Sequence, residues 1–232
     1  MSTEPLSPDL LDQLGKLSTC IVSNAIETFD ARLRNTGFAN SSIRCIFPEL
    51  PTLVGYAATV RIRSADPPME GHTYYARPDW WQYLQTIPEP RVVVIQDLDN
   101  PPSLGAFVGE VQANILMALG CRGIVTSGAV RDLPAIRAAR FQMFAGNVSV
   151  SHAYAHVFDF GRAVEVGGMH VRPGDLIQGD LHGVQTIPLE IATRVPSAAH
   201  EILGKRKALI DLCCSKDFTV EKLSEAVRQI ES

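Results

Sequence analysis

The sequence predicts an α/β fold with helices at both ends of the chain. Two observations carry this prediction: a strand, a helix and a strand follow one another between residues 92 and 126, and short apolar strands alternate with turns between residues 164 and 188. The first pattern is typical of a βαβ unit with a parallel pair of strands, and the second of a β-rich region. No segment is polar enough to form a linker, so residues 1–232 are expected to form one domain. Its core is expected at about 17–190 and a helical tail at about 191–232.

The first half of the chain gives three expected elements. Apolar residues recur at three-and-four spacing between residues 7 and 29, which predicts one or two helices. Residues 55–62 are small or β-branched and predict a strand. Residues 66–90 are rich in proline and aromatic side chains, and we expect an irregular or partly helical segment that covers either the core or a neighbouring molecule. Its aromatic cluster is Tyr74, Tyr75, Trp80, Trp81 and Tyr83.

The second half is more regular. Strands are expected at 92–95, 124–126 and 143–144, with helices at 110–119 and from Asp132 to Ala139. Gly146 and Asn147 are expected in a loop. From Ile191 onward the pattern is helical.

Composition excludes several function classes. The chain is 46% hydrophobic and 20% charged with a formal net charge of −4, which is not the basic balance that nucleic-acid backbones select. No apolar run reaches the roughly 18 to 20 residues of a membrane span, and the N-terminus does not resemble a secretory signal, so a cytoplasmic protein is expected. The five cysteines contain no C-x-x-C pair and are expected to be reduced, mostly buried thiols.

Two loops carry the candidate chemistry. Gly105 and Gly109 lie between a strand and a helix, and such a helix start binds anions, although a plain structural turn is equally compatible with this feature. Neither a G-x-G-x-x-G nor a Walker pattern is present, which argues against a dinucleotide or a nucleoside triphosphate. Arg131-Asp132 follows the next strand. Since parallel strands end at the same edge of a sheet, we expect the two loops to lie side by side.

Arg131 and Asp132 suit a small acid and a cation. The planar guanidinium of Arg131 fits a substrate carboxylate, and Asp132 offers an oxygen ligand that could hold Mg²⁺ or Mn²⁺ among water molecules. The spacing alone leaves an alternative of equal weight, in which Asp132 caps the helix that opens at Leu133-Pro134 and pairs with a nearby base.

One pattern joins the two loops: twenty residues separate Gly109-Glu110 from Arg131-Asp132. It resembles the acid, spacer and Arg-Asp pattern of the RraA-like family, whose enzymatic branch is the 4-hydroxy-4-methyl-2-oxoglutarate aldolases. Residues 17–23, 55–60, 122–125 and 171–188 extend the resemblance over most of the chain. It implies a three-layer β/β/α swivelling domain with flanking N- and C-terminal helices, assembled as a homotrimer or a hexamer. It also implies a metal-dependent lyase that forms pyruvate from a 2-keto acid and decarboxylates oxaloacetate.

The resemblance implies a role for each site residue. The backbone of Gly109, Glu110, Val111 and Gln112 would bind the pyruvyl group, and Arg131 would contact the same group. Asp132 would ligate the divalent cation, and Glu110 would hydrogen-bond a water molecule on it. The alternative within the family is a non-enzymatic regulator that binds ribonuclease E or another protein. Three features depart from the family pattern. Asn24 stands in place of Asp, and the aromatic segment from Tyr74 to Tyr83 replaces a blander stretch near the site. Unaligned matching puts Arg206 in place of a tail glutamate that a neighbouring subunit contributes.

Weaker candidates have ordinary interpretations. His152 and His156 have the spacing of a helical metal site, but their surroundings are not helical, which favours surface or interface histidines. Asp97, Asp99 and Asn100 at a strand end could be site acids and are more typical of a turn. Asp175 follows Pro-Gly and is typical of a turn closure.

Overall fold

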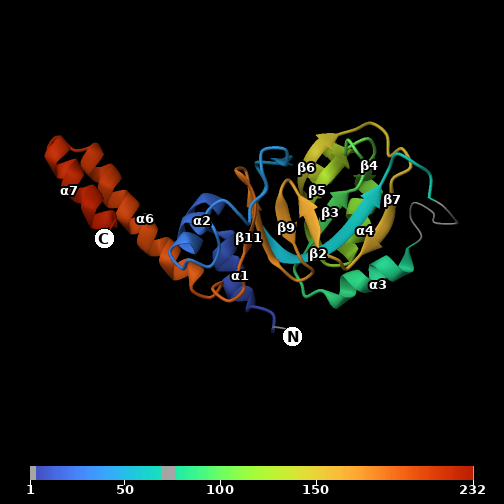
Figure 1. Ribbon diagram of the computed structural model, residues 1–232, viewed down its shortest axis with the longest axis horizontal. Helices are drawn as coiled ribbons and strands as arrows, with labels where there is room; N and C mark the ends of the chain where they lie inside the picture. Colours follow the sequence, from blue (N-terminus) through green and yellow to red (C-terminus); the bar gives the residue numbers. More distant parts are fainter. Residues whose placement is uncertain (1–3, 69–76, 232) are drawn as a thin grey trace.

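A curved sheet of nine strands forms the centre of the computed structural model, which describes residues 4–68 and 77–231 (Figure 1). Four neighbouring strands run parallel: β6 (Gln142–Val148), β5 (Cys121–Val130), β3 (Arg91–Asp97) and β2 (Leu53–Arg63). The antiparallel strands β10 (Leu176–Asp180) and β11 (Gly183–Ile187) extend the sheet beyond β2, and β1 (Arg44–Cys45) lies at its other edge. β4 (Ala106–Val108) pairs with β5, and β7 (His156–Phe160) pairs with β2.

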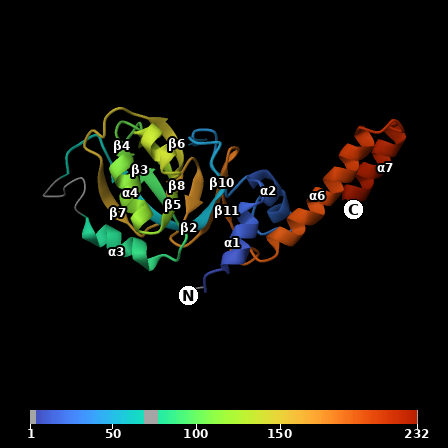
Figure 2. The same cartoon turned by 180° about the vertical axis from the view of Figure 1, so that it is seen from behind.

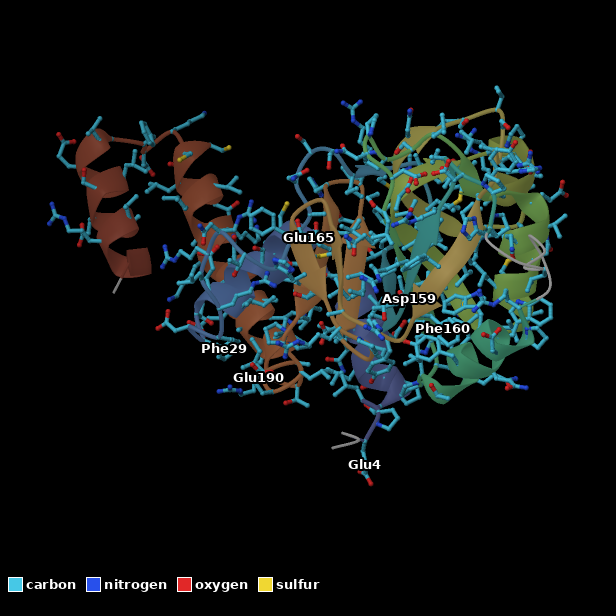
Figure 3. The ribbon with its side chains drawn as sticks, turned by 45° about the vertical axis from the view of Figure 1, so that its right-hand side comes forward. Glu4, Phe29, Asp159, Phe160, Glu165 and Glu190 are labelled. Atoms are coloured by element: carbon cyan, nitrogen blue, oxygen red, sulfur yellow. The ribbon has the colours of Figure 1, made fainter. Side chains whose placement is uncertain are left out.

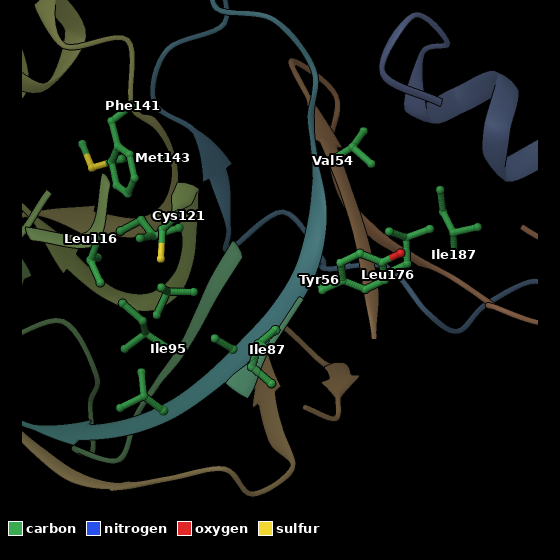
Figure 4. Close-up of a cluster of buried hydrophobic side chains, with 14 of the residues drawn as sticks. Val54, Tyr56, Ile87, Ile95, Leu116, Cys121, Phe141, Met143, Leu176 and Ile187 are labelled. Atoms are coloured by element: carbon green, nitrogen blue, oxygen red, sulfur yellow. The ribbon is translucent and has the colours of Figure 1, made fainter. Parts of the chain in front are cut away.

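Each face of the sheet buries its own set of apolar side chains. Successive residues of a strand point to opposite faces, and β3 accordingly directs Val92 and Val94 to one cluster and Val93 and Ile95 to another. The hairpin of β8 (Val164–Val166) and β9 (Met169–Val171) covers the first face. α4 (Glu110–Ala118) and α5 (Leu133–Ala138) contribute to the cluster on the second, part of which Figure 4 shows. The predicted α/β fold with three layers is therefore confirmed.

Helices from both ends of the chain pack together beside β10 and β11. α1 (Pro8–Gly15), α2 (Thr19–Glu27) and the first turns of α6 (Val195–Cys213) lie there, and the rest of α6 extends outward and pairs with α7 (Val220–Glu231) (Figures 1 and 2). Buried polar side chains attach α2 to the sheet. Asp180 accepts hydrogen bonds from the backbone N–H and the hydroxyl of Thr19, at 2.9 and 2.7 Å.

Two predictions about elements need comment. Gly146 and Asn147 were expected in a loop, and this was wrong: both belong to β6, where Asn147 lies opposite Ala129 of β5. The partly helical segment is confirmed by α3 (Pro78–Thr86), in which buried Trp80 packs against Tyr83 and Phe160 at 5.6 Å between ring centroids. Figure 3 labels Phe160, which lies beside α3. Tyr74 and Tyr75 lie outside the described residues. Among the helices that the structure describes, none is long and apolar enough to cross a membrane.

Candidate active site at the carboxyl edge of the sheet

Pairing of β4 with β5 brings the two candidate loops together. The register places Val108 opposite Val130, and the Arg131 backbone N–H donates to the carbonyl of Val108 at 3.1 Å. Gly109 follows β4 and Arg131 follows β5, so the start of α4 and the Arg131-Asp132 loop lie side by side at this edge of the sheet. The expected contact between the loops is therefore present.

Asp132 binds the start of α4 rather than its own helix. Its backbone lies in the left-handed region at φ 56°, and its side chain makes no capping hydrogen bond to α5. Instead Oδ2 accepts the backbone N–H of Glu110 at 2.9 Å. The capping part of the alternative is therefore wrong, because the carboxylate is turned across to the neighbouring helix. Its other part, pairing with a nearby base, is present in the contact with Arg131. The hydrogen bond from Glu110 satisfies one of the N–H groups at the start of α4 that have no partner within the helix, and Oδ1 takes no part in it.

Gly109 is required by this contact. A Cβ built on residue 109 would lie 2.5 Å from Asp132 Oδ2 and 2.9 Å from Arg131 Nε. Its φ of −123° is open to any residue, so close approach of the two side chains explains the glycine and backbone strain does not. Glycine therefore lets the carboxylate and the guanidinium reach the helix start.

Arg131 is held close to Asp132 with one donor unsatisfied. Its Nε lies 3.6 Å from Asp132 Oδ2, an ion pair beyond hydrogen-bond length, and its side chain is 28% exposed. Within the described residues this Nε is a buried polar atom with no hydrogen-bond partner. A buried N–H without a partner costs about 1–3 kcal/mol. An acceptor supplied by a ligand would remove that cost, which makes Arg131 suited to an incoming carboxylate.

The other predicted residues occupy the first turn of α4. Glu110 and Val111 are exposed, whereas the side chain of Gln112 is buried. The N-terminal N–H groups of a helix lack partners within it and carry partial positive charge, which favours an anion here. Asn114, which the sequence did not single out, donates from its side-chain amide to the Glu110 carbonyl at 2.8 Å. A side-chain donor four residues along a helix is too common for sequence alone to mark it as functional.

A cation at this site would have one protein carboxylate as its direct ligand. Among residues 4–68 and 77–231, no group of three or more His, Cys, Asp or Glu side chains could hold a metal ion. One or two carboxylates, several water molecules and oxygens of the substrate are nevertheless the ligands that Mg²⁺ commonly has in proteins. Asp132, whose carboxylate lies beside the unsatisfied Arg131 donor, fits such an ion.

The weaker candidates have structural roles. Asp99 accepts the backbone and hydroxyl donors of Ser64, 35 residues away in the sequence, and so joins two segments instead of forming a turn. Asp97 accepts the backbone N–H groups of Asp99 and Ser103, as expected for a turn. Burial raises the pKa of Asp97 and these hydrogen bonds oppose the change. Asp175 closes its turn by accepting the Arg172 N–H.

In the part of the chain that the structure describes, neither the pair His152 and His156 nor the cysteines form a second centre. Nδ1 of His152 and Nδ1 of His156 each lie 2.7 Å from a nearby backbone carbonyl. Burial raises the pKa of Cys45 to about 11 and that of Cys121 to about 12, so both thiols are protonated at neutral pH and are poor nucleophiles. Cys20, Cys213 and Cys214 are exposed, contrary to the expected burial.

Two of the departures from the family pattern, Asn24 and Arg206, lie far from this site within one chain. Asn24 is on the exposed side of α2, and Arg206 is exposed on the outer part of α6. Both helices lie at the other end of the molecule from α4 and β4 (Figure 1).

A family model described as RraA-like, Aldolase/RraA, matches residues 8–185. The chain belongs to the RraA-like family. Within it, a protein of Halalkalibacterium halodurans named "Putative 4-hydroxy-4-methyl-2-oxoglutarate aldolase" is 34% identical over 84 residues, which are 36% of this chain and 40% of that relative. The RraA-like chain thus matches less than half the length of this relative.

Solved structures show the same RraA-like fold. An uncharacterized protein from Pseudomonas syringae pv. tomato superposes with a TM-score of 0.73 at 20% identity, with 97% of each chain covered. RraAS2 of Streptomyces coelicolor, described as an unusual member of the RNase ES inhibitor RraA protein family, has a TM-score of 0.69 at 19% identity. This match covers 88% of the present chain and 97% of RraAS2.

Proposed function

We propose that this RraA-like protein is a lyase that uses a divalent cation, Mg²⁺ or Mn²⁺, to cleave a carbon–carbon bond of a 2-keto acid and release pyruvate. The substrate class is that of 4-hydroxy-4-methyl-2-oxoglutarate, with decarboxylation of oxaloacetate as a second activity. One observation carries the proposal: Asp132 and the unsatisfied Nε of Arg131 meet at the start of α4. The aldolase name of the Halalkalibacterium relative supports it.

Each residue has a chemical task in this proposal. Arg131 binds the substrate carboxylate through its planar fork, and the first N–H groups of α4 bind the same end of the substrate. Asp132 would hold the cation through its carboxylate. When bound, the cation would supply the Lewis-acid stabilisation that lowers the energy of the pyruvate enolate. Positive groups fixed before the reaction stabilise charge that develops only as the bond breaks.

Glu110 is the carboxylate that remains for proton transfer. Retro-aldol cleavage breaks the C3–C4 bond, passes the bonding pair to the pyruvyl fragment and requires loss of the proton on the 4-hydroxyl. The other carboxylate, Asp132, is engaged by the Glu110 N–H, whereas the Glu110 side chain is exposed at the first turn of α4. Decarboxylation of oxaloacetate releases CO₂ and needs no such base.

Pyruvate release tests this proposal. We expect formation of pyruvate from both acids with Mg²⁺ and its loss on chelation. A protein that releases no pyruvate above background from either acid, with either cation, is not a lyase of this class.

The alternative is a regulator that binds ribonuclease E or another protein. It is favoured by apolar residues exposed along α6, after it and at the first residue of α7, namely Leu203, Ile210, Phe218 and Val220. Capture of a ribonuclease from the host, lost when these four residues are replaced by Ser and unaffected by Asp132→Ala, would establish this role. We also propose that the protein is cytoplasmic and assembles as a homotrimer or a hexamer. Light scattering measures the mass of this assembly.

A further inference from the structure

A groove in the described part of the molecule lies at the opposite edge of the sheet from the candidate active site. It has a volume of about 1130 Å³ and runs along the first residues of the parallel strands, at Leu53, Cys121 and Gln142. The candidate site lies where β4 and β5 end. Small-molecule sites commonly have volumes of roughly 300–1,000 Å³, so the groove is large enough for a ligand of its own.

One wall of the groove is apolar. Leu6, Leu11, Leu50 and Met117 line it, and they are buried or partly buried against the core cluster. Cys121 adds to this surface, and its pKa of about 12, raised by burial, keeps the thiol neutral. This wall therefore suits the chain or ring of an organic molecule.

The other wall carries unbalanced positive charge. Of the charged residues that line the groove, Asp12 pairs with Lys16 at 2.5 Å, and Glu89 pairs with Arg91 of β3 at 3.0 Å. Arg122 and Arg140 remain. Both are exposed, and within residues 4–68 and 77–231 neither side chain has a hydrogen-bond or ion-pair partner.

Adjacent strands bring the two arginines to the same edge. Arg122 directly precedes Gly123 of β5, Arg140 precedes Gln142 of β6 by two residues, and Gly123 and Gln142 are register partners. A carboxylate or a phosphate is the kind of group that Arg binds through paired N–H donors, and two arginines lie here at neighbouring strand starts.

Arg140 occupies a position where glycine is normally preferred. α5 ends in a Schellman motif, in which the Phe141 N–H donates to Ile136 and the Arg140 N–H to Arg137. The residue in the left-handed conformation of this motif is usually Gly, and here it is Arg140 at φ 58°. An L residue in this region is strained, and such an outlier points to a function of the side chain.

We propose that this groove binds a small organic anion with an apolar body. Its carboxylate or phosphate lies between Arg122 and Arg140, and its apolar part lies along Leu6, Leu50 and Met117. The proposal is independent of the lyase activity, because no groove residue belongs to the site at Arg131 and Asp132.

Calorimetric titration of the full chain tests the proposal with four probes: decanoate, decyl phosphate, decanol and acetate. We expect one molecule of decanoate or decyl phosphate per chain, and the stronger of the two identifies the head group. Decanol lacks the charge and acetate lacks the apolar body, so both should bind at least about tenfold more weakly.

The arginine variants make the test specific. The double variant Arg122→Gln/Arg140→Gly should lose at least about tenfold in affinity for the anion while it stays folded, because glycine is preferred at position 140. Arg162→Gln, which removes a 73% exposed arginine outside the groove, should bind normally. Asp132→Ala should also bind normally, which separates this site from the lyase.

Three outcomes would overturn the proposal. The first is the absence of saturable binding by either ten-carbon anion. The second is an affinity that does not depend on the charges, seen either as equal binding of decanol or as full affinity in the double variant. The third is a change in oligomeric state of the double variant in light scattering, which would show that the groove is an interface between copies of the chain.

Discussion

Gly109 and Asp132 fit together because residue 109 has no side chain. The carboxylate that accepts the Glu110 N–H occupies the space that a Cβ would need, and Arg131 Nε lies at its border. Gly109 follows β4, and Arg131 and Asp132 follow β5, so the positions of residues from two strand ends depend on direct contacts between them. The chemistry of the site is correspondingly sensitive to small displacements.

Gly109→Ala is expected to reduce pyruvate release about a hundredfold, because the Asp132 carboxylate has to move away from its position. The thermal transition should remain close to that of the wild type. Gly204→Ala is the matched control, since a Cβ at this exposed helical position meets nothing within 4 Å. Wild-type rates in Gly109→Ala would show that the Asp132 geometry does not matter for activity.

Glu110→Gln separates the two proposed reactions. Retro-aldol cleavage should fall by about 10²–10⁴, the usual contribution of general acid–base catalysis. Decarboxylation of oxaloacetate, which needs no base, should fall by less than about tenfold. Steady-state kcat for both acids measures the difference, and an equal loss in both reactions would rule out proton transfer by Glu110.

At the scale of secondary-structure elements, α2 depends on a buried acid from the other end of the sequence. Asp180 of β10 accepts two hydrogen bonds from Thr19 and one from the backbone of His182. Burial acts to raise the pKa of Asp180, but together these hydrogen bonds hold it below the ordinary value of an aspartate. The ionised form therefore stabilises the folded state.

Asp180→Asn is expected to lower the free energy of unfolding by about 1–3 kcal/mol at neutral pH. A carboxylate with a depressed pKa contributes stability above its unfolded-state pKa and loses it as the pH falls through the folded-state pKa. The difference between wild type and variant should therefore be constant above about pH 5 and shrink below about pH 4. Urea denaturation across this range measures it, and a difference independent of pH would refute the role of the charge.

Helices and buried strands could be predicted because their apolar residues repeat with the period of the element. The end of β6 could not, since Gly146 and Asn147 are typical of loops. A Cβ at Gly146 would lie 2.6 Å from the Ser127 carbonyl of β5, so this glycine allows close approach between strands and does not end one. Only the tertiary pairing distinguishes the two roles.

At the scale of the whole molecule, the two edges of the parallel sheet have different origins in the sequence. The carboxyl edge could be predicted, because two polar loops follow consecutive parallel strands and must meet there. The groove at the amino edge could not, because α1, three strand starts and the end of α5 each contribute isolated residues to it. The direction of the Asp132 side chain, across to α4, also required the structure.

The central claim is that Asp132 makes this RraA-like protein a metal-dependent lyase. Pyruvate formation from 4-hydroxy-4-methyl-2-oxoglutarate and oxaloacetate, with Mg²⁺ or chelator, tests it in wild type, Asp132→Ala and the control Asp211→Asn, whose carboxyl is exposed on α6. We predict release that requires the metal, persists in the control and falls by at least about a hundredfold in Asp132→Ala. Undiminished release from Asp132→Ala, or release that survives chelation, would contradict the claim.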